Sequence, residues 1–185
     1  MRYSRDLHHR RSIRLQGHDY TQPATYFVTL VTYNREHLLG DVRDRQMHEN
    51  GLGSIARTCW LAIPDHFPAV ALDAFVVMPN HIHGIVIIHP RRGVQLNAPT
   101  GNNAPAGNYS SMSPRPGSLP VIIRTYKAAV TTQCRRAGHV GFAWQRNYYE
   151  HVIRDENDLR RIQEYIHNNP AQWDLDRQNP VHGDL

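Results

Sequence analysis

Lysine is nearly absent from this chain of 185 residues, in which Lys127 is the single lysine among 21 basic side chains. Cysteine is scarce too, because only Cys59 and Cys134 occur, far apart and without a metal-type spacing. This scarcity argues against a disulfide framework and against a zinc knuckle. No apolar run approaches the length of a membrane span, and the amino terminus carries no apolar core of a signal peptide. These absences predict a soluble, cytoplasmic protein that does not contact a membrane.

The basic residues that are present give a formal net charge of +5 and a pI of about 9.5. Arginine offers a planar, permanently charged fork that suits phosphate oxygens and stacks on bases. A GC-rich coding sequence would also enrich arginine without any function, and the composition leaves both explanations open. The charge therefore permits a nucleic-acid partner without proving one.

The length favours one compact domain over residues 1–185, with two atypical segments. Residues 1–20 form a basic arm that is too polar to fold alone, so it is a solvated tail or orders on a phosphate backbone. Residues 91–118 are rich in Gly, Ala, Pro and Ser and show no periodicity. This insertion is either disordered, which we favour, or a loop that closes over a ligand.

Hydrophobic patterning outside these segments predicts seven elements. Strands are expected at 25–34, on either side of a turn at 78–80, and at 144–154. Helices are expected at about 46–66, from Ser118 to near Gly138, and from Asp155 to Pro170. The order is that of an α+β, ferredoxin-like βαββαβ sandwich with an additional C-terminal helix. In this topology the first and third strands are central, which places the strand that begins at His81 in mid-sheet.

Two histidines, His81 and His83, stand two residues apart at the start of that strand. Side chains alternate along a strand, so both imidazoles project from the same face, where one metal ion could bridge them. Ile85 and Ile87 continue this face, and the opposite face is apolar as well, which requires a cover on both sides. We expect the last helix to cover the histidine face.

On that helix, Tyr165 and Asn169 lie one turn apart along one edge of the apolar stripe. A helix over the histidines would present this phenol and this amide at the rim of the core. Seen alone, the helix favours a simpler interpretation, in which the tyrosine flanks the core and the asparagine prepares the helix end. The buried stripe itself is expected to consist of Leu159, Ile162 and Ile166.

Taken together, these blocks resemble the single-tyrosine HUH transposases of insertion sequences, and more closely their relatives, the REP-associated tyrosine transposases. The order and separation of the last three blocks make the resemblance specific. The matching segments, which span most of the chain, are Arg11-Ser-Ile-Arg-Leu, Tyr26-Phe-Val-Thr, Met78-Pro-Asn-His-Ile-His-Gly, Trp144-Gln-Arg-Asn-Tyr-Tyr-Glu-His-Val-Ile-Arg-Asp and Tyr165-Ile-His-Asn-Asn-Pro.

The resemblance implies an enzyme that nicks and rejoins single-stranded DNA through a 5′-phosphotyrosine intermediate. It implies Tyr165 as the nucleophile, with His81, His83 and Asn169 as ligands of a divalent metal ion, Mg²⁺ or Mn²⁺. Better-known insertion-sequence members tend to carry Gln at the position of Asn169. The phosphotyrosine conserves the bond energy, so no nucleotide cofactor is expected. The implied substrate is a DNA hairpin beside a short guide sequence, bound by a monomer or homodimer.

Two alternatives remain at this point: a non-catalytic nucleic-acid-binding module on the same fold, and a metal-dependent nuclease that attacks with water. The phosphate contacts are harder to place, because a single basic residue is most often a solvated charge. The candidates for DNA binding are Arg10, Arg11, Arg14, Arg91, Arg92, Arg124, Lys127 and Arg146.

Overall fold

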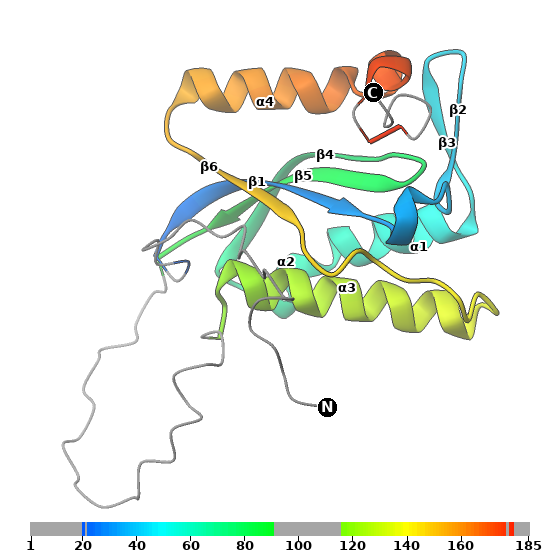
Figure 1. Cartoon of the computed structure of the whole chain (residues 1–185). Helices are drawn as coiled ribbons and strands as arrows, with labels where there is room; N and C mark the ends of the chain where they lie inside the picture. The colour runs from blue at the N-terminus through cyan, green and yellow to red at the C-terminus, as the bar shows by residue number, and fades with distance from the viewer. Residues whose placement is uncertain (1–19, 21, 91–115, 177, 180–185) are drawn as a thin grey trace, which may run out of the picture.

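The computed structural model describes residues 20, 22–90, 116–176 and 178–179, in which one antiparallel sheet lies between two layers of helices (Figure 1). The predicted arm at 1–20 and insertion at 91–118 therefore fall almost entirely outside the described residues. The strand order is β4-β5-β1-β6. This order confirms the ferredoxin-like α+β topology and the central place of the histidine strand. The strands are β1 (Ala24–Val31), β4 (Val70–Val77), β5 (His81–Ile88) and β6 (Tyr149–Ile153).

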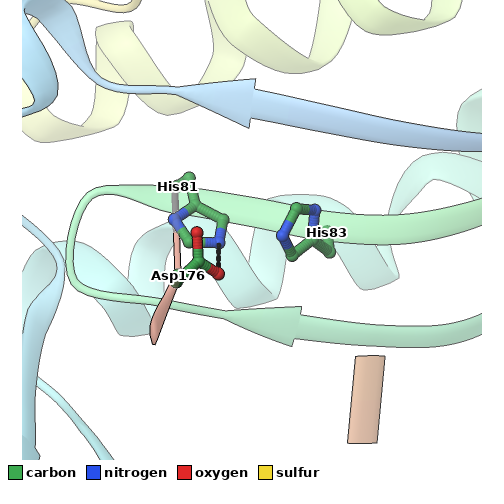
Figure 2. A group of neighbouring side chains, drawn as sticks. All are labelled: His81, His83 and Asp176. Atoms are coloured by element: carbon green, nitrogen blue, oxygen red, sulfur yellow. Dashed lines mark ion pairs between the residues drawn. The ribbon is translucent and has the colours of Figure 1, made fainter. Parts of the chain in front are cut away.

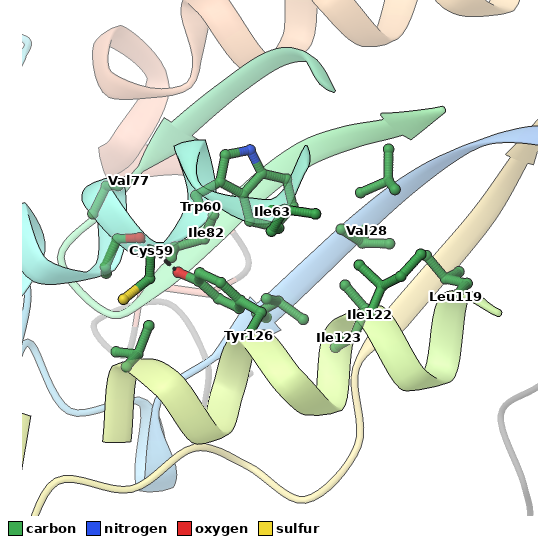
Figure 3. Packing of buried hydrophobic residues seen from close by; sticks show 14 of the residues in the cluster. Val28, Cys59, Trp60, Ile63, Val77, Ile82, Leu119, Ile122, Ile123 and Tyr126 are labelled. Carbon is green, nitrogen blue, oxygen red and sulfur yellow. Dashed lines mark hydrogen bonds between the residues drawn. The ribbon is translucent and has the colours of Figure 1, made fainter. Parts of the chain in front are cut away.

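Three helices cover one face of the sheet, namely α1 (Gly51–Leu61), α2 (Ile63–His66) and α3 (Leu119–Arg136). They enclose the larger apolar core, in which Trp60 of α1 meets Tyr126 of α3 edge to face (Figure 3). The buried Tyr126 hydroxyl donates to the backbone carbonyl of Ala56 at 3.1 Å. Since an unbonded buried hydroxyl is costly, this bond removes a penalty of roughly 1–3 kcal/mol.

Gly84, next to the histidine pair on β5, leaves room for the ring of Trp60 on this face. A Cβ atom added at Gly84 would lie 2.3 Å from Cζ2 of Trp60. We expect Gly84→Ala to lower the free energy of unfolding by about 2 kcal/mol, because a packed core resists overfilling. Urea denaturation measures this. Gly51→Ala is the control, because its Cβ would meet nothing within 4 Å; equal losses in both variants would contradict the prediction.

The opposite face is covered by α4 (Glu156–Asn168) and by the 3₁₀ helix η3 (Pro170–Leu175), as Figure 1 shows. The predicted helix start is confirmed, since Asp155 Oδ1 accepts from the backbone N–H groups of Asn157 and Asp158. The predicted cover of the histidine face is confirmed as well. Buried residues of α4 and of the sheet form a second, smaller core there, consisting of Phe27, Ile85, Ile153, Ile162 and Ile166.

The helix expected at 46–66 was predicted too long, and it starts at Gly51. Its first residues instead form β3 (Gln46–Glu49), which pairs with β2 (Gly40–Arg43) in a hairpin that the patterning did not reveal. Asn50 explains the boundary, because its side-chain oxygen caps the first turn of α1 at Leu52 and Gly53. The hairpin turn is made by Asp44 and Arg45, both in the left-handed region.

Two predicted strands are also shorter than expected. The first ends at Val31, after which Asn34 and Arg35 take left-handed conformations with φ of 52° and 55°. The last begins only at Tyr149, and before it Trp144 makes a single bridge to Thr32. Ser118 precedes α3 as predicted, although its side chain makes no capping bond. None of the described helices is long and apolar enough to cross a membrane.

Candidate metal and tyrosine site

The two histidines of β5 are buried, and each is held in place by a polar neighbour through its Nδ1 atom. His81 Nδ1 lies 2.9 Å from the side-chain oxygen of Asn80, and His83 Nδ1 lies 2.9 Å from the hydroxyl of Thr29 on β1. An amide oxygen can only accept, so His81 carries its proton on Nδ1 and leaves a lone pair on Nε2. Figure 2 shows the two rings side by side.

Burial determines the charge of both imidazoles. It lowers the pKa of His81 to about 4, against the opposing effect of the Asp176 carboxylate. The pKa of His83 is also lowered well below its ordinary value, chiefly because the ring is buried and secondly because His81 is next to it. Both rings are therefore neutral at neutral pH, which is the form that binds metal ions.

A carboxylate that sequence reasoning missed completes the cluster. Asp176 follows η3, which turns the chain back over the histidines, and its Oδ2 lies 3.8 Å from His81 Nε2 (Figure 2). One ligand atom from each of His81, His83 and Asp176 lies within 4.8 Å of the others. No spacing motif marks Asp176 in the sequence, because it lies beyond the helix and meets Asn169 through a contact of the folded chain.

The predicted third ligand, Asn169, lies in the same place but points its amide nitrogen at the carboxylate. Its Nδ2 donates to Asp176 Oδ2 at 2.8 Å. Its Oδ1 and the Nε2 of His81 are buried, and neither makes a well-aligned hydrogen bond among the described residues, although Asn169 lies near enough to His81 to raise the pKa of that ring. Two orphaned acceptors beside a carboxylate fit a cation, because it would satisfy all of them. Imidazole, carboxylate and amide donors together suit a divalent ion such as Mn²⁺ or Mg²⁺.

Tyr165 reaches this cluster from α4. Its Oη lies 3.1 Å from Nε2 of His83, and its ring meets those of His83 and Phe27 edge-on. The side chain is 41% exposed, so a substrate can reach the hydroxyl. Because Nδ1 of His83 is engaged by Thr29, Nε2 is the atom that serves Tyr165 here and would serve a metal ion. The tyrosine hydroxyl therefore lies directly beside the expected metal position.

A cavity of about 610 Å³ opens at this tyrosine, between the central strands β1 and β5, the segment that leads into β6, and the helices α4 and η3. Its wall combines groups of the cluster with aromatic rings and amides from the loop that precedes β6. It also includes Arg35, a cation that sequence reasoning did not select. The lining residues include His83, Tyr165, Asn169, Asp176, Tyr148 and Tyr149.

Three of the predicted phosphate contacts lie in the described part of the chain, and they come from two different segments. Arg124 and Lys127 lie on α3, across the sheet from α4, and Arg146 is exposed in the loop that lines the cavity. The other predicted contacts lie outside the described residues; they are Arg10, Arg11, Arg14, Arg91 and Arg92.

Lys127 on α3 stabilises the loop that precedes β6. Its Nζ donates to the carbonyls of Gln145 at 2.8 Å and Asn147 at 2.9 Å, which uses two of the three donors of the ammonium group. Burial lowers the pKa of Lys127 to about 8. Because Gln145 and Asn147 line the cavity, the lysine supports the cavity wall. One donor remains for a phosphate.

We expect Lys127→Met to lower the free energy of unfolding by about 2 kcal/mol. Its two hydrogen bonds from a charged donor contribute roughly 1.5–3 kcal/mol each, and methionine recovers part of this because it avoids the cost of burying the charge. The slope of DNA affinity against salt should stay unchanged. Urea denaturation and a salt titration measure the two quantities. Arg124→Met, an exposed change on the same helix, should leave stability unchanged. An unchanged stability of Lys127→Met together with a slope reduced by about 0.7 would instead identify Lys127 as a phosphate contact.

The fold and the cluster define a class: a ferredoxin-like sandwich whose extra helix brings a tyrosine to a buried histidine pair. Among solved structures, a REP-associated tyrosine transposase bound to a REP hairpin superposes with a TM-score of 0.54 and 21% identity, over 83% of this chain and 70% of that chain. The likeness confirms the predicted fold. An uncharacterized protein of Haemophilus influenzae is 42% identical over 176 residues, 95% of this chain and 96% of that protein. The chain belongs to the same family as that protein. No protein-family model matches the chain.

Proposed function

We propose that the protein is a metal-dependent transposase that nicks and rejoins single-stranded DNA through Tyr165. The observation that carries the proposal is the position of the Tyr165 hydroxyl, 3.1 Å from the ligand nitrogen of a buried histidine and at the wall of a cavity. Metal donors and a potential nucleophile thus meet at one accessible point. We propose His81, His83 and Asp176 as the ligands, with Asn169 adjoining them.

The reaction we propose is a transesterification in which Tyr165 Oη attacks the phosphorus of a phosphodiester. The new bond joins the tyrosine oxygen to phosphorus, and the bond from phosphorus to the 3′ oxygen breaks. The phenol proton ends on the departing 3′ oxygen, which leaves a 5′-phosphotyrosine and a free 3′ hydroxyl. A bound Mg²⁺ or Mn²⁺ supplies neutralisation of the phosphate charge. A free 3′ hydroxyl reverses the step without a nucleotide cofactor.

The surroundings of Tyr165 suit an unpaired nucleic-acid strand. Tyr148 and Tyr149 line the cavity, and aromatic rings stack on bases of any sequence. Arg35 and the exposed Arg146 supply positive charge nearby. The structural neighbour was solved with a REP hairpin. We transfer this ligand to the present chain and propose a hairpin with an adjoining single strand as its substrate. The proposed activity on DNA agrees with the predicted cytoplasmic location.

Covalent trapping tests the proposal. The full chain is incubated with Mn²⁺ and a single-stranded, REP-like hairpin labelled at its 3′ end, so that the label stays with the 5′-phosphotyrosine. We expect a labelled band at the protein mass in a denaturing gel, lost on addition of EDTA. Tight binding without any cleavage would favour a non-catalytic binding module on the same fold. Cleavage without an adduct would favour a nuclease that uses water.

A further inference from the structure

We propose that Asn80 is a positioning residue that aims the Nε2 lone pair of His81 at the metal position. The inference rests on the metal site of the proposed function. Asn80 precedes the first histidine in the turn between β4 and β5, and it is fully buried. Residues of such turns are most often exposed, so complete burial of a polar side chain here needs a reason.

Three hydrogen bonds engage both ends of the Asn80 side-chain amide. Its oxygen accepts from His81 Nδ1 at 2.9 Å. Its nitrogen donates to the carbonyl of Arg35 at 3.0 Å and to the carbonyl of Gln178 at 2.7 Å. Because both of the latter partners are carbonyls, the nitrogen must face them and the oxygen must face His81. The orientation of the amide is therefore fixed by its environment.

The fixed amide determines which nitrogen of His81 is available. A neutral imidazole carries one proton, and the Asn80 oxygen holds that proton on Nδ1. The lone pair of Nε2 then points toward Asp176 Oδ2, 3.8 Å away. Without this acceptor the ring could turn or adopt the other tautomer, in which Nε2 cannot bind a metal ion. Removal of such a supporting group typically weakens metal affinity by roughly 10- to 100-fold.

Asn80 also connects the two chain segments that border the cavity. Arg35 lies in the left-handed turn after β1, and Gln178 lies two residues beyond Asp176. The backbone carbonyl of Asn80 in addition accepts from the backbone N–H and the hydroxyl of Thr32, at 2.8 Å and 3.0 Å. One side chain thus joins the ligand strand to the segment that supplies the carboxylate.

Two substitutions separate this role from a purely structural one. Asn80→Ala removes the acceptor and both donors, whereas Asn80→Asp keeps an oxygen for His81 in either protonation state and removes at least one donor. We expect both variants to melt at a lower temperature than the wild type. Only Asn80→Ala should lose Mn²⁺ affinity, by roughly 10- to 100-fold, while Asn80→Asp stays within about threefold of the wild type. Isothermal titration with Mn²⁺ and thermal unfolding measure the two quantities.

Asn50→Ala is the matched control, because it removes an asparagine whose side chain caps α1 and forms its hydrogen bonds with the backbone of Leu38, Leu52 and Gly53. It should lower the melting temperature and leave Mn²⁺ affinity unchanged. Mn²⁺ affinity of Asn80→Ala equal to that of the wild type would overturn the positioning role alone. Affinity that follows melting temperature across all three variants would do the same. A wild type that binds no Mn²⁺ would instead overturn the metal site of the proposed function.

Should Asn80→Ala fail to fold, the wild-type protein still decides the matter. A long-range ¹H–¹⁵N spectrum of the metal-free protein should show His81 protonated on Nδ1, because the Asn80 oxygen holds the proton there. Protonation on Nε2 would overturn the proposal. This measurement requires neither metal nor substrate, so its outcome does not depend on the proposed activity.

Discussion

Tyr165→Phe is expected to abolish the covalent protein–DNA adduct and to lower the rate of strand cleavage by at least about 10³-fold, because phenylalanine has no nucleophilic oxygen. The substitution removes one hydroxyl at the wall of the cavity and its contact with His83, and it leaves the ring packed against Phe27. Stability and hairpin affinity should therefore stay close to those of the wild type. A denaturing gel with labelled hairpin measures the adduct, and single-turnover kinetics measure cleavage.

Tyr149→Phe is the matched control for the choice of tyrosine. Tyr149 lines the same cavity, is exposed and meets Phe27 edge-on, but belongs to β6 rather than α4. The variant should form the adduct at the wild-type level. Adduct formation by Tyr165→Phe, together with its loss in Tyr149→Phe, would move the nucleophile to β6. Cleavage that persists in Tyr165→Phe without an adduct would identify water as the nucleophile.

Loss of metal binding is the second large effect that we expect. His81→Ala removes one of the two imidazoles of the cluster without touching the hydrogen bond between Tyr165 and His83. Removal of a ligand costs more than removal of its supporting group, so Mn²⁺ affinity should fall by more than about 100-fold. Mn²⁺-dependent cleavage should disappear with it. Electron paramagnetic resonance of free Mn²⁺ measures the affinity directly, without reference to activity.

His66→Ala is the control, because this histidine is exposed at the end of α2, on the other side of the sheet. It should bind Mn²⁺ like the wild type. Unchanged Mn²⁺ affinity in His81→Ala would show that the metal, if bound, lies elsewhere. Cleavage by wild type in EDTA would show that the reaction needs no divalent ion.

Local periodicity was sufficient to predict how the central part of the sheet is covered. Alternation along β5 placed His81 and His83 on one face above Ile85, and the structure confirms a helix on that face. The stripe of Ile162 and Ile166 likewise fixed which side of α4 is buried. These predictions succeed because a strand or helix repeats at a fixed interval, so that burial follows directly from position in the sequence.

Periodicity failed where single side chains or turns decide the structure. The β2–β3 hairpin is too short to show an alternating pattern, and its turn uses Asp44 and Arg45 in the left-handed region, where Asn and Gly would be the usual signal. The start of α1 depends on the cap of one residue, Asn50. The bonds of Lys127 to two backbone carbonyls likewise leave no trace in the sequence, so its support of the cavity wall was not predicted.

The sequence by itself determined the order of the four strands of the main sheet and of the helices α1, α3 and α4. It also determined the histidine pair on one strand face and the helix that carries Tyr165. Only the tertiary structure brought Asp176 and Asn80 into the same site, and only it placed the Tyr165 hydroxyl 3.1 Å from His83. The physical reason is that the ends of α4 and η3 set the path of the chain after Asn169. The contacts of Tyr165 and Asp176 with the histidines of β5 join segments that are distant in the sequence. Such contacts depend on packing and not on local propensity.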